Sequence, residues 1–281
     1  MVRDMEPLLT STFGGALAVL LGLLWGSFAN VCIYRWPPTD EHPKGRSVVK
    51  PGSHCGSCKA PIAWYDNVPI LSYLWLRGHC RNCKASFSPR YLLVEAVTAA
   101  LFGVAWWFTL GEGGFYYMTF EHALVKFLID AAFIFVLVVI AFIDLDHMLI
   151  LDKVTFPSIA IAYIASLYDH HWWEGLIGAA IGYGLPWLIG WVYLKLRDRE
   201  GLGLGDGKLL ALVGALLGWK GVIVSLFGGA LIGSIIGIVA LTRAKSKDVM
   251  TSELPFGPFL SAAAVFYLFA EPWIVVYFRL L

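Results

Sequence analysis

Long apolar runs are the feature that most restricts how this chain can fold. Several stretches of the 281-residue sequence approach the ~20 apolar residues that a helix needs to cross a bilayer. Hydrophobic residues make up 58% of the sequence and charged residues only 15%, whereas soluble domains carry about 25% charged residues. One water-soluble core cannot bury this much apolar surface. An integral membrane protein is therefore favoured over an unusually hydrophobic soluble one.

The pattern predicts an all-α polytopic membrane protein with about eight transmembrane helices. The apolar segments lie near 11–34, 91–110, 121–143, 154–168, 174–194, 208–219, 221–241 and 256–271. The fourth, sixth and eighth segments are short, and one of them could be re-entrant. The first run is not expected to be a signal peptide, because the residues before it are not basic and the run is too long.

The basic residues indicate the orientation of the spans. With the N-terminus outside, 17 of the 21 Lys and Arg residues fall on the inner side, as the positive-inside rule requires. Nine of them lie in the polar loop 35–90. The predicted organisation is therefore a first transmembrane helix over 1–34, a cytoplasmic domain over 35–90, and a transmembrane core over 91–281.

Four of the five cysteines form two close pairs in this loop. The sequence reads Cys-Gly-Ser-Cys at Cys55 and Cys58 and Cys-Arg-Asn-Cys at Cys80 and Cys83, which is C-x2-C twice with a spacer of 21 residues. This spacing is typical of a closed four-thiolate site for structural zinc, with no open position for catalytic water. Disulfides and a redox pair are the alternatives, and a cytoplasmic loop disfavours disulfides.

Some neighbouring side chains have simpler interpretations. The histidines that precede the first cysteine of each pair, His54 and His79, could replace a ligand, but solvated loop histidines are the better interpretation. Cys32 lies in the first span and is interpreted as a packed small residue.

Two aspartate motifs fall at the same predicted depth on the inner side of the membrane. Asp144 and Asp146 lie at the inner end of the third span, and Asp206 follows Gly203 and Gly205 at the inner start of the sixth. Ionisable groups close to hydrocarbon mark functional sites by default. Two carboxyl groups that share a proton can activate a water and polarise a carbonyl, as in aspartic proteases.

The spacing of the aspartates alone favours a simpler alternative, in which they are ordinary carboxylates at helix ends. Asp206 precedes a predicted helix and could be its N-cap. Gly203 and Gly205 argue for more, because glycine permits unusual dihedrals and close approach of a peptide backbone. Neither a P-loop nor a dinucleotide fingerprint fits this loop, and we expect no nucleic acid partner.

Three further polar residues lie in or near spans. Lys126 and Asp130 are four residues apart in the third segment and are expected to pair with each other. Glu95, near the inner end of the second span, could face an active cavity or extend toward the interface.

These motifs together resemble the bacterial type IV prepilin leader peptidase/N-methyltransferase family. The matching stretches are the end of the first span, the cysteine loop through Glu95, Asp144 and its preceding Ile, the G-x-G-D run that ends at Asp206, and Pro-Phe-Gly-Pro-Phe. The sequence departs from the family at two places. The usual Leu-Pro-Asp is Leu151-Asp152 preceded by Ile150, which lacks the Pro, and Leu92 stands where Pro usually follows Arg-Tyr.

The resemblance implies an activity, partners and cofactors. It implies an aspartic endopeptidase of the bacterial inner membrane that removes the basic leader of type IV prepilins or type II secretion pseudopilins after Gly. Asp144 and Asp206 would be catalytic, Asp146 is the runner-up for the first position, and Gly203, Gly205 and Glu95 would support them. It also implies that the enzyme methylates the new N-terminus with S-adenosylmethionine. The other expected cofactor is structural zinc, and membrane lipid is an expected partner.

Two other classes of protein remain open at this point. A non-enzymatic membrane scaffold would use its zinc module to bind cytoplasmic partners, and its aspartates would be structural. A transporter could use intramembrane charges to line an ion path, but both motifs are predicted at the inner edge rather than at the midplane.

Overall fold

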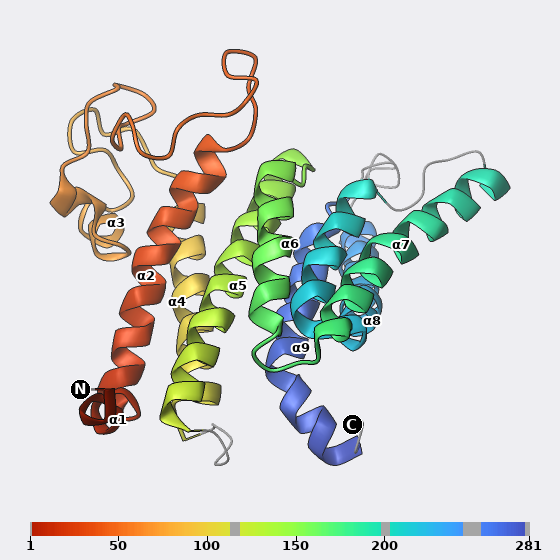
Figure 1. Cartoon of the computed structure of the whole chain (residues 1–281). Helices are drawn as coiled ribbons and strands as arrows, with labels where there is room; N and C mark the ends of the chain where they lie inside the picture. The colour runs from red at the N-terminus through yellow and green to blue at the C-terminus, as the bar shows by residue number, and fades with distance from the viewer. Residues whose placement is uncertain (1, 113–118, 198–202, 244–253, 279–281) are drawn as a thin grey trace. The chain divides into compact units, whose positions relative to one another are not determined.

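The computed structural model describes residues 2–112, 119–197, 203–243 and 254–278, and these residues are helical apart from loops (Figure 1). Within them, β-type pairing is limited to three isolated bridges. The elements are α1 (Val2–Leu9), α2 (Thr12–Arg35), η1 (Trp64–Asn67), α3 (Leu71–Trp75), α4 (Arg90–Thr109), α5 (Phe120–His147), α6 (Asp152–Ser166), α7 (Trp172–Arg197), α8 (Leu204–Arg243) and α9 (Gly257–Phe278). The predicted all-α fold class is confirmed.

Six of these helices are long and apolar enough to cross a membrane, namely α2, α4, α5, α7, α8 and α9. The predicted count of eight is not confirmed. The segment expected at 154–168 is α6, whose 15 residues extend about 22 Å, less than the ~30 Å hydrocarbon core. The segments expected at 208–219 and 221–241 both lie within α8, which consists of two helices that meet at the non-helical residue Gly218, so the predicted boundary between them is present. This residue has φ 66° and ψ −175°, a conformation that glycine adopts without steric cost.

The chain forms two compact units, Met1–Val139 and Ile140–Leu281. Helix α5 contributes its first part to one unit and its last residues, which include Asp144, to the other. The loop between α2 and α4, with its four cysteines, belongs to the first unit. The three expected domains, 1–34, 35–90 and 91–281, were drawn where the polarity of the sequence changes, whereas the two units are defined by packing. The expected domain boundaries therefore stay a prediction. The orientation also stays a prediction, and three of its basic residues, Arg199, Lys245 and Lys247, lie outside the described residues.

In the first unit, small residues bring α2 and α4 into backbone contact. Ala18, Gly22, Gly26 and Asn30 recur at every fourth position of α2, and all are buried. A Cβ atom added at Gly22 would lie 2.6 Å from the Cα of Ala99, and one added at Gly26 would lie 2.7 Å from the Cα of Glu95. Membrane helices commonly pack through such stripes of small residues, because hydrocarbon gives them little other drive to associate.

The first unit also contains an ion pair that the sequence predicted. Lys126 Nζ and Asp130 Oδ1 lie 2.5 Å apart on α5, which confirms the predicted i,i+4 pair. Pairing reduces the cost of placing two charged groups in an apolar helix.

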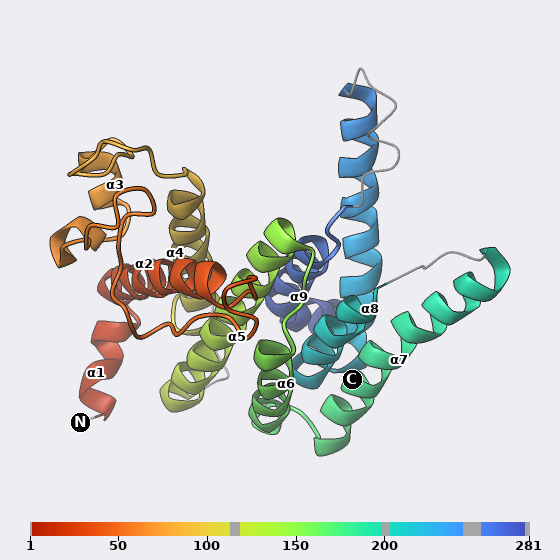
Figure 2. The same cartoon turned by 90° about the horizontal axis from the view of Figure 1, so that it is seen from above.

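In the second unit, α8 packs against α6, α7 and α9 (Figure 2). Residues 209–218 of α8 are buried at every position. Close contact with α7 depends on glycine, since a Cβ atom at Gly178 would meet the carbonyl oxygen of Gly214 at 2.2 Å. A Cβ atom at Gly182 would meet the carbonyl oxygen of Leu210 at the same distance. This packing fixes the start of α8, where Asp206 lies.

Candidate functional site

Asp144 is a buried carboxylate in the last turn of α5. Only 6% of the residue is exposed. Its Oδ2 atom accepts a hydrogen bond of 2.9 Å from the backbone N–H of Gly257, the first residue of α9. A buried carboxylate needs such a donor, because loss of its hydration is otherwise not compensated. The start of α9 therefore holds the carboxyl group of Asp144 in place.

Asp206 lies in the first turn of α8 and is half-buried. It is the third residue of the helix rather than its N-cap, and its own N–H donates to the carbonyl oxygen of Gly203 at 3.1 Å. Asp144 and Asp206 lie within electrostatic reach of each other, although 62 positions separate them in the sequence. Asp146, the alternative first aspartate, is exposed.

The two glycines before Asp206 leave room near its carboxyl group. A Cβ atom at Gly203 would lie 3.4 Å from Oδ2 of Asp206, and one at Gly205 would lie 3.3 Å from the Cβ of Ile150. The unusual dihedrals expected there are not observed. Among the described glycines, a positive φ occurs at Gly45, Gly78 and Gly218.

An ion pair connects the start of α8 to the start of α6. Lys208 Nζ pairs with Asp152 Oδ1, and the ammonium group lies 5.6 Å from the centre of the Phe156 ring. The sequence analysis assigned no role to Asp152 or Lys208. This ion pair holds the first turn of α8, which carries Asp206, against the first turn of α6, which follows Asp144 in the chain.

In the first unit, the four predicted cysteines converge. Their sulfur atoms all lie within 4.8 Å of one another. The Sγ–Sγ distance is 3.8 Å between Cys55 and Cys83 and 4.0 Å between Cys58 and Cys80. Four thiolates at a Zn–S distance of about 2.3 Å in a tetrahedron are about 3.8 Å apart, so this donor set fits zinc.

The two cysteine pairs have the same backbone conformation. In each, the N–H of the first cysteine donates to the carbonyl oxygen of an alanine five residues later, Ala60 or Ala85. The lysine after each second cysteine, Lys59 or Lys84, has φ 59°. The shared run Cys-x-x-Cys-Lys-Ala is the signal that could have revealed this internal repeat, which the sequence analysis did not identify.

Backbone hydrogen bonds favour the thiolate at one cysteine of the cluster, Cys55. Hydrogen bonds from the backbone of Cys58 and Ser57 lower the pKa of the Cys55 thiol to about 6, which favours the thiolate that binds metal. His54 and His79 instead use Nδ1 to contact the carbonyl oxygens of Gly52 and Arg77, at 3.1 and 2.6 Å. The four cysteines are therefore a sufficient ligand set without either histidine.

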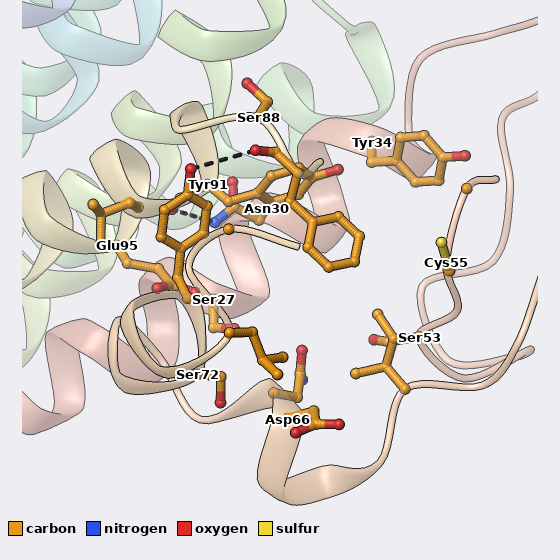
Figure 3. Close-up of a pocket in the computed structure, with 18 of the residues that line it drawn as sticks. Ser27, Asn30, Tyr34, Ser53, Cys55, Asp66, Ser72, Ser88, Tyr91 and Glu95 are labelled. Atoms are coloured by element: carbon orange, nitrogen blue, oxygen red, sulfur yellow. Dashed lines mark hydrogen bonds between the residues drawn. The ribbon is translucent and has the colours of Figure 1, made fainter. Parts of the chain in front are cut away.

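A cavity of about 410 Å³ lies between the cysteine loop and the ends of α2 and α4 (Figure 3). Glu95 lies on its wall and is 8% exposed. Glu95 Oε2 accepts a hydrogen bond of 2.7 Å from the N–H of Ile70, and the hydroxyl group of Ser27 also contacts its carboxyl group. The side chain of Asn30 donates to the carbonyl oxygen of Tyr91 at 3.0 Å.

The chemistry of this cavity suits a polar small molecule that carries a cation. Ligand cavities commonly measure about 300–1,000 Å³ and combine apolar walls with a few fixed polar groups. Here the polar groups include Glu95, Ser27 and Asn30, and the aromatic rings of Tyr34, Tyr73 and Phe87 also line the wall. The sequence analysis expected that Glu95 could face an active cavity, but it assigned no site role to Ser27, Asn30 or the aromatic residues around it.

Comparison with known proteins assigns both parts of the chain to one family. Residues 20–109 match the bacterial peptidase A24 N-terminal domain, and residues 131–238 match the type IV leader peptidase family. A prepilin leader peptidase/N-methyltransferase of Aeromonas salmonicida is 35% identical over 270 residues, covering 88% of each chain. A protein of the same name from Neisseria gonorrhoeae is 37% identical over 279 residues, covering 90% of this chain and 89% of the relative. No solved structure matches significantly. The chain therefore belongs to the type IV leader peptidase family.

Proposed function

We propose that this protein is a prepilin peptidase of the bacterial inner membrane. Its substrates are type IV prepilins or type II secretion pseudopilins, from which it removes a short basic leader after Gly. The names of its relatives support this substrate class. Six helices that are apolar enough to span a membrane support a multi-pass enzyme. The distribution of basic residues supports an N-terminus outside and an active site at the cytoplasmic face.

The observation that carries the proposal is the position of the buried Asp144 carboxyl group within electrostatic reach of Asp206. Asp144 is held by the N–H of Gly257. In the proposed mechanism the two carboxyl groups share one proton, as close carboxyl pairs do. The ionised member takes a proton from a water, and the protonated member donates to the carbonyl oxygen of the scissile Gly bond. The water then attacks the carbonyl carbon directly, without a covalent enzyme intermediate.

The second proposed activity is methylation of the new N-terminus, with S-adenosylmethionine as the methyl donor. We propose that this donor binds in the cavity lined by Glu95. The donor supplies a methyl group on a positively charged sulfur, and a buried carboxylate is a suitable neighbour for such a cation. Ser27 and Asn30 offer hydrogen bonds, and the ring of Tyr73 or Phe87 offers an apolar surface to the adenine.

The proposed role of the four cysteines is structural. Bound zinc would fix the two knuckles relative to each other, and these knuckles carry part of the cavity wall, including Cys55. A loop of this size has little apolar core of its own, so the metal would supply much of its folding free energy.

The experiment that tests the peptidase proposal measures leader removal from a membrane-inserted prepilin by mass spectrometry. The enzymes compared are the wild type, Asp144→Ala, Asp206→Ala and the exposed neighbour Asp146→Asn as a matched control. Wild type and Asp146→Asn are expected to release the leader, whereas the other two variants leave it attached while retaining zinc. If all four enzymes cut equally, the catalytic assignment is wrong. If wild type cuts no prepilin or pseudopilin, the scaffold alternative is favoured.

A further inference from the structure

The short helix α3 and the preceding η1 turn present an apolar surface outward. Leu71, Leu74 and Trp75 of α3 are 66%, 60% and 82% exposed, and Trp64 of η1 is 82% exposed. Ser72, between Leu71 and Leu74, is less exposed than either of them. Ser72 Oγ donates to the carbonyl oxygen of Tyr65 at 2.9 Å. This is the reverse of the arrangement expected for a segment in water.

Contacts with the long helices fix the level of α3 along the membrane normal. Ile70, the residue before α3, donates its N–H to Glu95, which also contacts Ser27. Ser27 lies eight residues before the end of α2 at Arg35, about 12 Å along the helix axis. Glu95 lies five residues after the start of α4, about 7.5 Å along its axis. Accordingly, α3 runs beside the C-terminal half of α2 rather than beyond its end (Figure 1).

From these observations we infer that α3 is an interfacial anchor, with Leu71, Leu74 and Trp75 inserted into the lipid of the membrane surface. The contacts that hold α3 lie about 7.5–12 Å from the ends of α2 and α4, which compares with the roughly 5–10 Å to which the apolar face of an interfacial helix is buried. Tryptophan is enriched at this level because its ring is apolar and its N–H is polar. Arg77 follows two residues after Trp75 and is exposed, so it can reach a lipid phosphate.

We infer that lipid rather than a protein covers the apolar surface of α3. The reason is that α3 lies beside α2 and α4, within the length over which these two helices can cross the membrane. Both α2 and α4 are long and apolar enough to cross the bilayer, and α3 lies within their length. Any soluble partner would have to enter the headgroup region to reach Trp75. The anchor gives the cysteine loop a third attachment to the membrane, in addition to the covalent connections to α2 and α4.

A photocrosslinking experiment on the full-length protein tests this inference. A benzophenone amino acid replaces Trp75 or, as the control, Val49, which is 77% exposed. Val49 is a suitable control because it lies near the end of α2 rather than beside its length. Arg35, the last residue of α2, donates a hydrogen bond to the carbonyl oxygen of Ser47, two residues before Val49. Each variant is placed in vesicles of phosphatidylethanolamine and phosphatidylglycerol, irradiated, and analysed by intact mass, with one zinc per chain as the test of folding.

The expected result is a lipid adduct at position 75 that exceeds the background found at position 49. Protein adducts at position 75, or equal lipid labelling at both positions, would overturn the inference.

A second measurement needs no substitution. A lipid that carries a diazirine in its upper acyl chain is photolysed with the wild-type protein, and the tryptic peptide 60–77 is examined. Label on this peptide supports the anchor, and label confined to the long helices contradicts it.

Discussion

The backbone N–H of Gly257 donates a hydrogen bond of 2.9 Å to Oδ2 of Asp144, from a position 113 residues later in the chain. This contact brings the start of α9 against the end of α5, beside the carboxyl group to which we assign catalysis. No side chain can replace the hydrogen of Gly257 without movement, because a Cβ atom there would lie 2.7 Å from Oδ2.

Replacement of Gly257 by alanine is therefore expected to displace the Asp144 carboxyl group and slow leader removal. A misplacement of about 1 Å in a catalytic group can cost roughly a hundredfold in rate, so we expect kcat/KM to fall by about tenfold to a hundredfold. The matched control is Gly184→Ala in α7, where an added Cβ atom meets nothing within 4 Å. If both variants cut prepilin at the wild-type rate, the contact has no role in positioning Asp144.

Replacement of Glu95 by glutamine is expected to separate the two activities. The amide keeps the size of the side chain but removes the negative charge that would attract the methyl donor. Mass spectrometry should then show normal leader removal, together with loss of the ~14 Da increase that methylation gives. Glu121→Gln, at an exposed position in the first turn of α5, is the control and should methylate normally. Full methylation by Glu95→Gln would exclude the cavity as the donor site.

Substitution of a single cysteine of the cluster should release the metal. Cys80→Ala is expected to lower the zinc content from one ion per chain to none and to lower the unfolding temperature, because metal binding contributes to the folding free energy. Cys32→Ala is the control, since Cys32 is fully buried in α2 and lies outside the cluster. Zinc content is measured by atomic emission. Retention of a full zinc equivalent by Cys80→Ala would show that other residues hold the ion.

The ion pair of Asp66 and Arg81 leads to a prediction about how the stability of the folded state depends on pH. Arg81 donates to both carboxylate oxygens of Asp66, with Nε–Oδ2 at 2.7 Å and Nη2–Oδ1 at 2.5 Å. These hydrogen bonds lower the pKa of Asp66 below its ordinary value of 3.8. A lowered pKa stabilises the folded state at every pH above the unfolded value, and this contribution is lost only as the pH falls through the folded value.

The difference in unfolding temperature between wild type and Asp66→Asn should therefore stay constant from pH 6 to pH 8. It can be followed by scanning fluorimetry in detergent, with zinc present in both samples. A difference that disappears as the pH falls from 8 to 6 would contradict the assigned titration range.

Local patterns in the sequence predicted several features correctly. The convergence of Cys55, Cys58, Cys80 and Cys83 follows from their spacing, because each C-x2-C turn forms its own geometry. The Lys126–Asp130 pair follows in the same way from helix periodicity. The aspartate motifs were identified by their position at the ends of apolar segments, which hydropathy and charge reveal.

Features that depend on tertiary packing were not predicted. The donor to Asp144 is a backbone N–H of Gly257, and a main-chain group leaves no mark in composition. The eight predicted segments correspond to six candidate spans because α6 is too short to cross a membrane and because α8 includes two of the predicted segments, which meet at Gly218. The cavity at Glu95 and the depth of α3 both depend on the contact between Ile70 and a residue 25 positions away.

The most direct test of the central claim, that Asp144 and Asp206 act as one catalytic unit, is a double-mutant cycle. The value of kcat/KM for leader removal is measured for wild type, Asp144→Asn, Asp206→Asn and the double variant, with zinc content as the test of folding. Each single substitution is expected to lower kcat/KM by roughly 10²–10⁴-fold, the usual contribution of acid–base catalysis. The double substitution should cost little more than either single one, because residues that act as a unit are not additive. Losses that multiply independently, or a single variant that cuts at the wild-type rate, would contradict the account.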